Sequence, residues 1–561
     1  MAKRRIADEV AHSEQPNKRL RRGTRDHISP LSDELLLRIL SNLPVATLAL
    51  CQQVSHRFHS IGGDSQLWKS AYYNRFVRPR ALRIPGISFP ESSPDNFVFS
   101  SHRSRWLGDE SLLKQGKEVD WKRQYKLRHN WSRGSCDTSQ IRLGELPVTP
   151  PLLVQLQEEL AFTVDGTSGL RVWDTKADKK LLAAVDLKQA GEPSSRSSNP
   201  TSLAVDCSAE STSDVCVGFG DGHFSIYRLN RTEGIFQFRH SHPPSLNGTL
   251  TALAFSSPYL LTMTERQLLS IYTFAAEDGS TLQKDTLAPP RLLSSLKSHT
   301  VWPPLSLSIR STSSQVVASI AFAIPTFLSG WSVGLQELQF TAEGEITQSR
   351  LTTAVNQGFT PLTPGQPTSS SSSPSPHANA RGRRGLGSIL SSARPTSLSY
   401  SHPYLLVSHP DNTLTLYLVS STSAELSISE GSRLWGHTSS VSGVAVGGRG
   451  KAVSVSMRGE ELRVWELEGG FRSATSKRKL DAGQVSVQIR PEPKREEAGT
   501  DSEEDVPPKS PATPTGTRLA LQRSIRSLDF APGWIGFDEE RVIVLREEDQ
   551  GNQNLVVYDF T

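Results

Sequence analysis

The sequence predicts a multidomain α+β chain, in which a small all-α module precedes an all-β domain built as a propeller of repeated blades. Three observations lead to this prediction: leucines at helical spacing near the N-terminus, short strand motifs that recur from about residue 140, and two polar segments rich in Pro, Ser and charge. These features are typical of a helical module, a blade array and disordered insertions, respectively. A chain of 561 residues is long enough to hold all three.

Composition excludes several classes of protein. We expect no membrane span, because no run of about 18 apolar residues occurs, and no secretory signal, because no apolar stretch follows the charged N-terminus. The four cysteines are Cys51, Cys136, Cys207 and Cys216. They share no C-x-x-C spacing, which excludes a RING-type zinc site and favours reduced thiols over a disulfide framework.

Residues 1–27 form a basic tail that we expect to be disordered. Residues 1–26 hold eight basic and four acidic side chains, an excess of four in a chain of net charge +5, so nucleic acid is not expected to bind the remainder. Two basic clusters comprise Lys3, Arg4 and Arg5, and Lys18, Arg19, Arg21 and Arg22. They resemble a bipartite nuclear import signal, and the alternative is a solvated basic arm. We therefore expect the protein in the nucleus, in the cytoplasm or in both.

Residues 28–73 are predicted to form the helical module. Ser32 is a favourable N-cap, and Asp33 and Glu34 lie in the first turn, where the helix dipole stabilises anions. The apolar positions of this helix are Leu35, Leu36, Ile39, Leu40 and Leu43. Pro44 ends the helix, a second one starts at Thr47, and a third carries Phe58 and Ile61.

The order of residues in this module resembles the F-box, a helical module that docks on the Skp-family adaptor of cullin-type ubiquitin ligases. The matching elements are Leu31, Glu34-Leu35-Leu36, Ile39-Leu40, Leu43-Pro44, Leu48, Val54-Ser55-His56-Arg57-Phe58 and Leu67-Trp68-Lys69. One departure is Ser32, since the family usually has proline there. The resemblance implies that the adaptor completes the core of these helices. It also implies that the adaptor is contacted by Leu31, Leu35, Leu36, Ile39, Leu40, Pro44, Leu48, Val54 and Trp68.

The segment that follows connects the helical module to the repeats. Residues 74–118 contain four prolines and no sustained period, so we expect a loop insertion. Residues 119–134 are rich in Trp, Tyr and basic side chains and are predicted to be a helical joint. This joint resembles the rigid spacer between the F-box and the propeller in F-box/WD-repeat proteins.

Residues 135–561 are predicted to form the propeller. An apolar-x-apolar-aromatic element recurs at Leu170–Trp173, Phe224–Tyr227, Leu269–Tyr272, Leu414–Tyr417, Leu462–Trp465 and Leu555–Tyr558. A second strand precedes five of these elements, at Thr201–Val205, Leu250–Phe255, Thr396–Tyr400, Val441–Val446 and Ile525–Phe530. A seventh blade fits between Tyr272 and residue 355, with strands at 319–324 and 331–335, and residues 140–143 are predicted to close the last blade.

These repeats resemble WD-repeat blades. The signature dipeptide occurs at Trp173-Asp174, and Gly436-His437 followed by Trp465 gives one further frame. In that blade Met457 or Arg458 occupies the place of the turn aspartate, so an incomplete His–Asp hydrogen-bond network is expected.

Two insertions, residues 357–395 and 470–517, interrupt the predicted ring. Both are too polar to bury the apolar surface that would offset their ordering entropy, so we expect disorder. Ser502 lies among acidic residues, whereas Ser510 and Thr513 each precede a proline. All three are candidate phosphorylation sites, and the alternative is a solvated loop.

No catalytic motif is present. The run at 447–452 has the lysine of a P-loop but lacks its leading glycine and its Ser/Thr, and neither H-E-x-x-H nor G-x-S-x-G occurs. We therefore expect no catalysis by this chain, no metal and no cofactor.

Together the two halves resemble the F-box/WD-repeat family, the substrate receptors of Skp–cullin–F-box ubiquitin ligases. The resemblance implies binding to the Skp-family adaptor and, through it, to a cullin and a RING subunit, while the propeller holds an unknown target protein. The main alternative is a nuclear WD-repeat scaffold that acts without a cullin. A second alternative, a hydrolase or lyase propeller, would need clustered carboxylates or metal ligands. A third, an RNA-binding protein, would need to bind RNA in a salt-sensitive way even after residues 1–26 are deleted.

Overall fold

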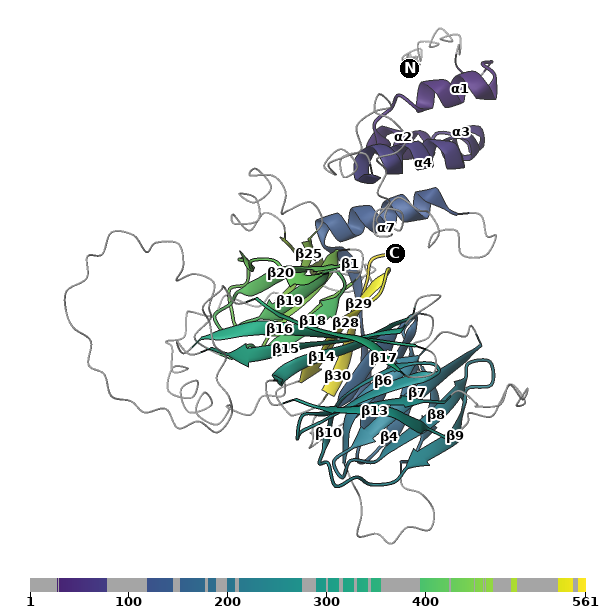
Figure 1. Ribbon diagram of the computed structural model, residues 1–561. Helices are drawn as coiled ribbons and strands as arrows, with labels where there is room; N and C mark the ends of the chain where they lie inside the picture. The colour runs from purple at the N-terminus through teal and green to yellow at the C-terminus, as the bar shows by residue number, and fades with distance from the viewer. Residues whose placement is uncertain are drawn as a thin grey trace, which may run out of the picture. The chain divides into compact units, whose positions relative to one another are not determined.

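The computed structural model divides the chain into a helical unit, which ends at Tyr125, and a propeller unit, which continues from Lys126 to Thr561 (Figure 1). The division falls within one helix, α7 (Trp121–Arg133). The structure describes residues 28, 30–77, 119–144, 152–176, 180–187, 199–206, 211–274, 289–298, 301–311, 316–326, 330–341, 345–354, 394–422, 425–447, 450–457, 459, 461–467, 486–491, 533–547 and 553–561. Within these ranges, no helix has the length and hydropathy of a membrane-spanning segment.

The helical unit contains short helices in the predicted order. They are α1 (Asp33–Leu40), α2 (Val45–Cys51), α3 (His56–Gly62), α4 (Ser65–Tyr72), the π-helix η1 (Tyr73–Val77) and the start of α7. Ser32 occupies the N-cap of α1 without a capping bond from its side chain. The second helix begins at Val45, two residues before the predicted Thr47, because Pro44 takes its N-cap position. The first residues of the predicted loop at 74–118 belong to η1.

The helical unit has an apolar core of its own. Its buried members are Leu36, Leu40, Leu48, Ile61, Leu67, Trp68, Tyr72, Trp121 and Tyr125. The Trp68 indole N–H donates to the carbonyl of Gly62 (2.8 Å), and its ring contacts that of Tyr125 edge-on at 5.6 Å. The helical unit thus buries part of its apolar face by itself, because aromatic side chains of α4 and α7 cover the leucines. That the adaptor completes this core stays a prediction.

The propeller unit has seven sheets, and each of the first six blades follows the chain in order (Figure 1). Blade one contains β2 (Leu153–Gln157), β3 (Leu160–Asp165), β4 (Gly169–Asp174) and β5 (Leu181–Val185); blade two contains β6 (Pro200–Asp206), β7 (Thr212–Phe219), β8 (Phe224–Asn230) and β9 (Ile235–His242); blade three contains β10 (Leu250–Ser256), β11 (Tyr259–Thr264), β12 (Leu268–Thr273) and β13 (Arg291–Lys297). Blade four contains β14 (Trp302–Ser311), β15 (Val316–Pro325), β16 (Trp331–Phe340) and β17 (Ile346–Thr353); blade five contains β18 (Ser397–Ser401), β19 (Tyr404–Ser408), β20 (Leu414–Ser421), β21 (Leu426–Ile428) and β22 (Ser432–Leu434); blade six contains β23 (Val441–Val446), β24 (Lys451–Ser456), β25 (Leu462–Glu466) and β26 (Ser486–Gln488).

The seventh blade joins the two ends of the propeller. It contains β28 (Ile535–Phe537), β29 (Arg541–Glu547), β30 (Gln553–Asp559), β1 (Ser135–Gly144) and β27 (Arg490–Pro491). Strand β1 pairs with β30 in antiparallel register, with Ile141 opposite Leu555. This pairing confirms the predicted closure by residues 140–143.

Contacts between blades close the ring and supply its core. The first strands of successive blades contact one another from β2 to β28, and β28 contacts β2. Seven apolar clusters lie at the seven junctions of neighbouring blades. Each strand thus presents alternate apolar side chains to a neighbouring blade, which is why the period-two motifs recur along the sequence.

The six apolar-x-apolar-aromatic elements all lie in third strands, and the predicted seventh blade is present as β14 to β17. Two predictions differ from the structure. The segment predicted to be disordered at 470–517 contains β26, in which Val487 pairs with Val464 and completes blade six. The first strand of blade seven is Ile535–Phe537, whereas the predicted Ile525–Phe530 lies outside the described residues. The insertion predicted at 357–395 also lies outside them, apart from its last two residues.

Candidate functional site

The helical unit exposes large apolar side chains that its core does not use. Leu35 and Ile39 of α1 are 52% and 49% exposed, and Leu50 and Val54 of α2 and its C-terminal turn are 63% and 71% exposed. Leu35 and Ile39 are four residues apart in α1, so they lie on one face of that helix, whereas Val54 lies beyond the C-terminal end of α2. We call these four side chains the exposed apolar set. Large exposed apolar side chains on a small unit are typical of a surface that binds a partner.

The nine residues predicted to bind the adaptor divide into two groups. Leu35, Ile39, Pro44 and Val54 are exposed, and Leu31 is half-buried against the core. Leu36, Leu40, Leu48 and Trp68 are buried within the unit. The prediction that this second group contacts a partner directly does not fit the structure, because their side chains pack against one another and against α7.

Arg57 connects α3 to the start of α1. Its guanidinium donates to the carbonyl of Leu31 (2.6 Å) and to the carboxylate of Asp33 (2.6 Å). Both side chains of the ion pair are well exposed, so its contribution to stability is small. The contact of Arg57 with the Leu31 carbonyl holds the backbone just before Ser32, the position at which the F-box pattern usually has proline.

Blade six contains a chain of hydrogen bonds that runs from Trp465 to His437. The Trp465 indole N–H donates to Ser454 Oγ (2.7 Å), Ser454 Oγ lies 2.6 Å from His437 Nε2, and His437 Nδ1 lies 3.4 Å from the Glu461 carboxylate. Burial lowers the pKa of His437 to about 4. His437 Nδ1 makes no hydrogen bond, so the network stops at the histidine and the expectation of an incomplete network agrees with the structure. The nearby acid is Glu461, just before β25, and not a residue at position 457 or 458.

Arginines beside the blade turns are paired with carboxylates. Arg171 lies 2.9 Å from Asp165, Arg433 lies 3.1 Å from Asp411, and Arg463 lies 2.7 Å from Glu461. Their charges are compensated within each blade. These arginines therefore do not form a ready-made phosphate site.

The propeller contains a cavity of about 470 Å³ at the ends of the first strands of blades six, seven and one. Its charged lining residues are Arg128, Glu158, Lys451, Asp538 and Glu539, and its aromatic ones are Trp534 and Phe537. Burial raises the pKa of Asp538 to about 6, and the ammonium of Lys451 lies 3.9 Å from the centre of the Trp131 ring. The sequence did not indicate this cavity, because its walls come from residues far apart in the chain.

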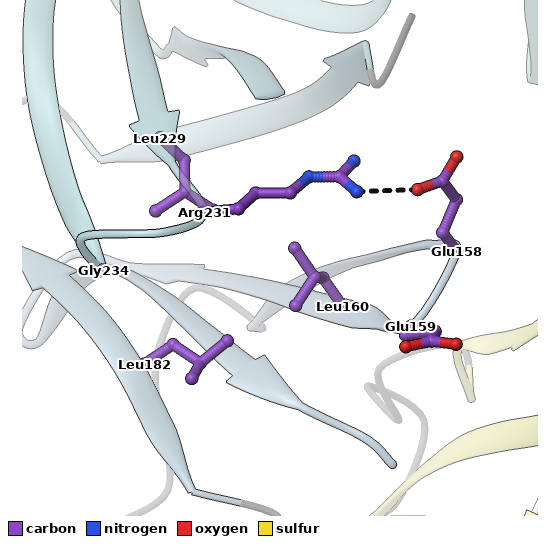
Figure 2. A pocket seen from close by; sticks show the side chains of 7 residues that line it. All are labelled: Glu158, Glu159, Leu160, Leu182, Leu229, Arg231 and Gly234. Carbon is purple, nitrogen blue, oxygen red and sulfur yellow. Dashed lines mark hydrogen bonds and ion pairs between the residues drawn. The ribbon is translucent and has the colours of Figure 1, made fainter. Parts of the chain in front are cut away.

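A smaller cavity of about 170 Å³ lies between blades one and two (Figure 2). Among the described residues, no group of three or more His, Cys, Asp or Glu side chains could hold a metal ion. The turn aspartates Asp165, Asp221 and Asp411 accept hydrogen bonds from their own turns, as expected of turn residues.

Two predicted sets of residues lie outside the described part of the chain. They are the basic clusters at Lys3, Arg4, Arg5, Lys18, Arg19, Arg21 and Arg22 and the candidate phosphorylation sites Ser502, Ser510 and Thr513. Both remain predictions.

Comparison with known families shows which protein family this chain belongs to. The profile of the family described as F-box protein pof12 beta-propeller matches residues 136–561. The chain belongs to this family. An F-box-like profile also matches residues 33–74, which cover α1 to α4 of the helical unit. The resemblance inferred from the sequence is thereby confirmed for both halves of this F-box protein.

Individual relatives agree with this assignment. F-box protein pof12 of Schizosaccharomyces pombe is 22% identical over 451 residues, which are 78% of this chain and 84% of the relative. F-box protein dre-1 of Caenorhabditis elegans is 37% identical over 81 residues, so this match spans 14% of the chain and only 8% of that relative. Among solved structures, the beta-propeller domain of Cps50 (Swd1) from Myceliophteria thermophila is 10% identical, with a TM-score of 0.36, over 74% of this chain and 98% of the domain.

Proposed function

We propose that this F-box protein is the substrate-recognition subunit of a Skp–cullin–F-box ubiquitin ligase. Its helical unit docks on a Skp-family adaptor, which brings a cullin and a RING subunit, and its propeller holds a target protein. The observation that carries the proposal is the exposed apolar set on an F-box-like unit that precedes a complete propeller.

The exposed apolar set supplies the driving force for docking. Covering a fully exposed large apolar side chain contributes about 1.5–3 kcal/mol, so the remaining exposure of Leu35, Ile39, Leu50 and Val54 is worth several kcal/mol together. The buried residues Leu36, Leu40, Leu48 and Trp68 act indirectly, because they hold the helices that present this set. Four such anchors are comparable to the few residues that dominate most protein interfaces.

The chain itself contributes no chemistry in this proposal. It acts by raising the effective concentration of target lysines near a loaded conjugating enzyme, which converts an intermolecular encounter into one within a complex. This role agrees with the generally adaptor-like character of proteins that combine an F-box with a propeller.

A pull-down of the full chain with the Skp-family adaptor and cullin tests the proposal. The test variant is Leu35→Glu/Ile39→Glu, which changes exposed positions of α1, and the matched control is Ser70→Glu, an exposed position of α4. We expect the wild type and the control to capture both proteins and the test variant to capture neither. Equal capture by the test variant, or no capture by the wild type, would contradict the proposal.

The alternative is a nuclear scaffold that binds the adaptor without a cullin. The two basic clusters of residues 1–27 support a nuclear location for either role. Capture of the adaptor without the cullin favours the scaffold. A fluorescent fusion tests the import signal, since replacing Lys18, Arg19, Arg21 and Arg22 by alanine should move the protein from the nucleus to the cytoplasm.

A further inference from the structure

The larger cavity of the propeller has apolar and aromatic side chains from three blades in its lining. Trp534 directly precedes β28 and Phe537 ends it, while Leu156 of β2 and Val446 of β23 belong to the neighbouring blades. Its volume of about 470 Å³ lies within the range of about 300–1,000 Å³ that is typical of small-ligand sites. All of its lining residues belong to the propeller unit.

Two glycines let the aromatic rings of this lining lie close to the backbone. A Cβ at Gly536 of β28 would lie 2.5 Å from Cη2 of Trp534 and 3.2 Å from the Cβ of Leu156. A Cβ at Gly447, which directly follows β23, would lie 3.1 Å from Cζ of Phe537. Any larger residue at Gly536 would push the indole away from this strand, because packed atoms do not approach so closely. The positions of both rings are thus set by the backbone of the first strands.

Three polar side chains of the lining have no hydrogen-bond partner in the described part of the chain. They are the guanidinium of Arg128, which also makes no ion pair there, the indole N–H of Trp534 and the amide of Gln155. All three residues are half-buried. Arginine and tryptophan side chains donate hydrogen bonds but cannot accept them. These groups therefore suit a ligand that accepts hydrogen bonds, and the charge of Arg128 favours an anionic one.

The carboxylates of the lining are paired or exposed. Glu158 lies 2.8 Å from the guanidinium of Arg231, as the dashed line in Figure 2 shows. Asp538 accepts from two backbone N–H groups, at 2.7 and 2.6 Å. Glu539 is exposed, so solvent screens its charge. A cationic ligand would compete with these existing contacts, whereas an anion meets the unpaired guanidinium of Arg128.

We infer that this cavity binds a carboxylate carried on an apolar group. The Arg128 guanidinium donates to both carboxylate oxygens, a geometry that this pair of groups frequently adopts, and the Trp534 indole N–H and the Gln155 amide are further donors. The apolar group lies against Phe537 and Leu156. Two sources offer this chemistry: the free carboxyl terminus of a polypeptide that ends in an apolar residue, and a small aromatic acid. The site does not involve the helical unit, so it is tested separately from docking on the adaptor.

Two panels of ligands test the inference on the purified full chain. One contains acetylated tripeptides that end in Leu, Ile, Val, Phe or Trp, and the other contains small aromatic acids such as phenylacetate, cinnamate and naphthoate. Every acid is paired with its primary amide. Saturation-transfer NMR identifies the acids that bind, and calorimetry gives their Kd. We expect at least one acid to bind with a Kd below about 1 mM, and its amide to bind at least about tenfold more weakly.

Matched variants of α7 assign the binding to the cavity. Arg128→Met removes the charge but keeps an unbranched apolar chain, and Arg133→Met makes the same change at an exposed position of the same helix outside the lining. We expect binding about 10- to 100-fold weaker for Arg128→Met and unchanged within about twofold for Arg133→Met. Trp534→Phe keeps a ring but removes the indole N–H, so it should weaken binding about three- to tenfold.

Circular dichroism first checks that each variant is folded, and Trp534→Phe becomes the test variant if Arg128→Met is not. Tighter binding of the tripeptide acids assigns the site to a polypeptide terminus, and tighter binding of the aromatic acids assigns it to a small acid; both results support the inference. Binding of no acid from either panel, equal binding of acids and amides, or wild-type affinity in the folded test variant would overturn it.

Discussion

The carboxylate of Glu337 lies 2.6 Å from the guanidinium of Arg310, and none of the Glu337 side chain is exposed. Its other oxygen lies 3.0 Å from Arg350 and accepts from Ser421 Oγ at 2.7 Å. Glu337 belongs to β16 of blade four and Ser421 to β20 of blade five. One buried charge thus joins two blades, and burial is tolerated only because both oxygens are paired.

Replacing Glu337 by Gln should destabilise the propeller strongly. The substitution leaves Arg310 and Arg350 without their carboxylate, and removing one partner of a buried pair costs about 3–5 kcal/mol. Denaturant unfolding followed by tryptophan fluorescence measures the change. Glu425→Gln, at an exposed position of blade five, is the control and should change the free energy of unfolding by less than about 0.5 kcal/mol. Equal stability of the two variants would contradict a structural role for Glu337.

The stability of the propeller should fall as the pH falls from about 6.5 to 4.5. Burial lowers the pKa of His437 to about 4, so its side chain stays neutral in the folded protein while the unfolded chain binds a proton below about pH 6.5. The contribution of His437 is therefore complete above pH 6.5 and is lost as the pH falls through 4. His409, whose pKa burial also lowers to about 4, acts in the same direction.

The variant His437→Gln isolates one of these two histidines. It lacks the hydrogen bond between the imidazole and Ser454, so it should be less stable than the wild type at pH 7. Between pH 6.5 and 4.5, however, its free energy of unfolding should fall by about 1–3 kcal/mol less than that of the wild type. Urea unfolding of both proteins at several pH values measures the difference. Parallel pH profiles would show that His437 is not the titrating group.

Replacing Asp538 by Asn should stabilise the protein at pH 8 by about 1–2 kcal/mol. Burial raises the pKa of the Asp538 carboxyl to about 6. Its contribution to the free energy of unfolding is therefore complete at pH values below the ordinary aspartate range and is lost as the pH rises through 6. Asparagine keeps the oxygen that accepts from the backbone N–H groups of Glu540 and Arg541. Thermal unfolding at pH 8 and pH 4 measures the effect, which should vanish at pH 4; the exposed Asp137→Asn is the control. A loss of stability at pH 8 would contradict the prediction.

Leu35 and Leu36 should separate docking from folding. Leu36→Ala removes a side chain that is 1% exposed and should destabilise the helical unit by about 2–5 kcal/mol. Leu35→Ala changes a side chain that is 52% exposed and should alter stability by less than about 0.5 kcal/mol while weakening capture of the adaptor. Far-ultraviolet circular dichroism during heating, beside a pull-down, measures both effects. If Leu35→Ala unfolds the unit, the leucine is part of the core and the proposed docking surface is wrong.

The regular features of this chain were predictable because they depend on local spacing. Leucines three and four residues apart predict helices, and the apolar-x-apolar-aromatic motif predicts third strands, since the side chains of a strand alternate between its two faces. Closure of the ring by residues 140–143 followed from the resemblance to WD-repeat propellers, in which the first strand commonly closes the last blade. Family resemblance then connected these elements in their order.

Features that depend on distant residues were not predictable in this way. Helical spacing could not show that Leu36 is buried and Leu35 exposed, because α4 and α7 supply the aromatic cover. The glutamate beside His437 was missed for a related reason: the folded turn brings Glu461 to 3.4 Å from the histidine, whereas the WD pattern places the acid at the turn position.

The sequence alone determined the helical module, the blade repeats and the membership of a family with both, since periodicity and motif order are properties of the chain. Only the tertiary structure decided which apolar side chains remain outside the core and where blades one and two enclose a cavity. Burial depends on every neighbour in space, and those neighbours come from strands and helices far apart in the sequence. The exposed apolar set is therefore a feature of the folded protein.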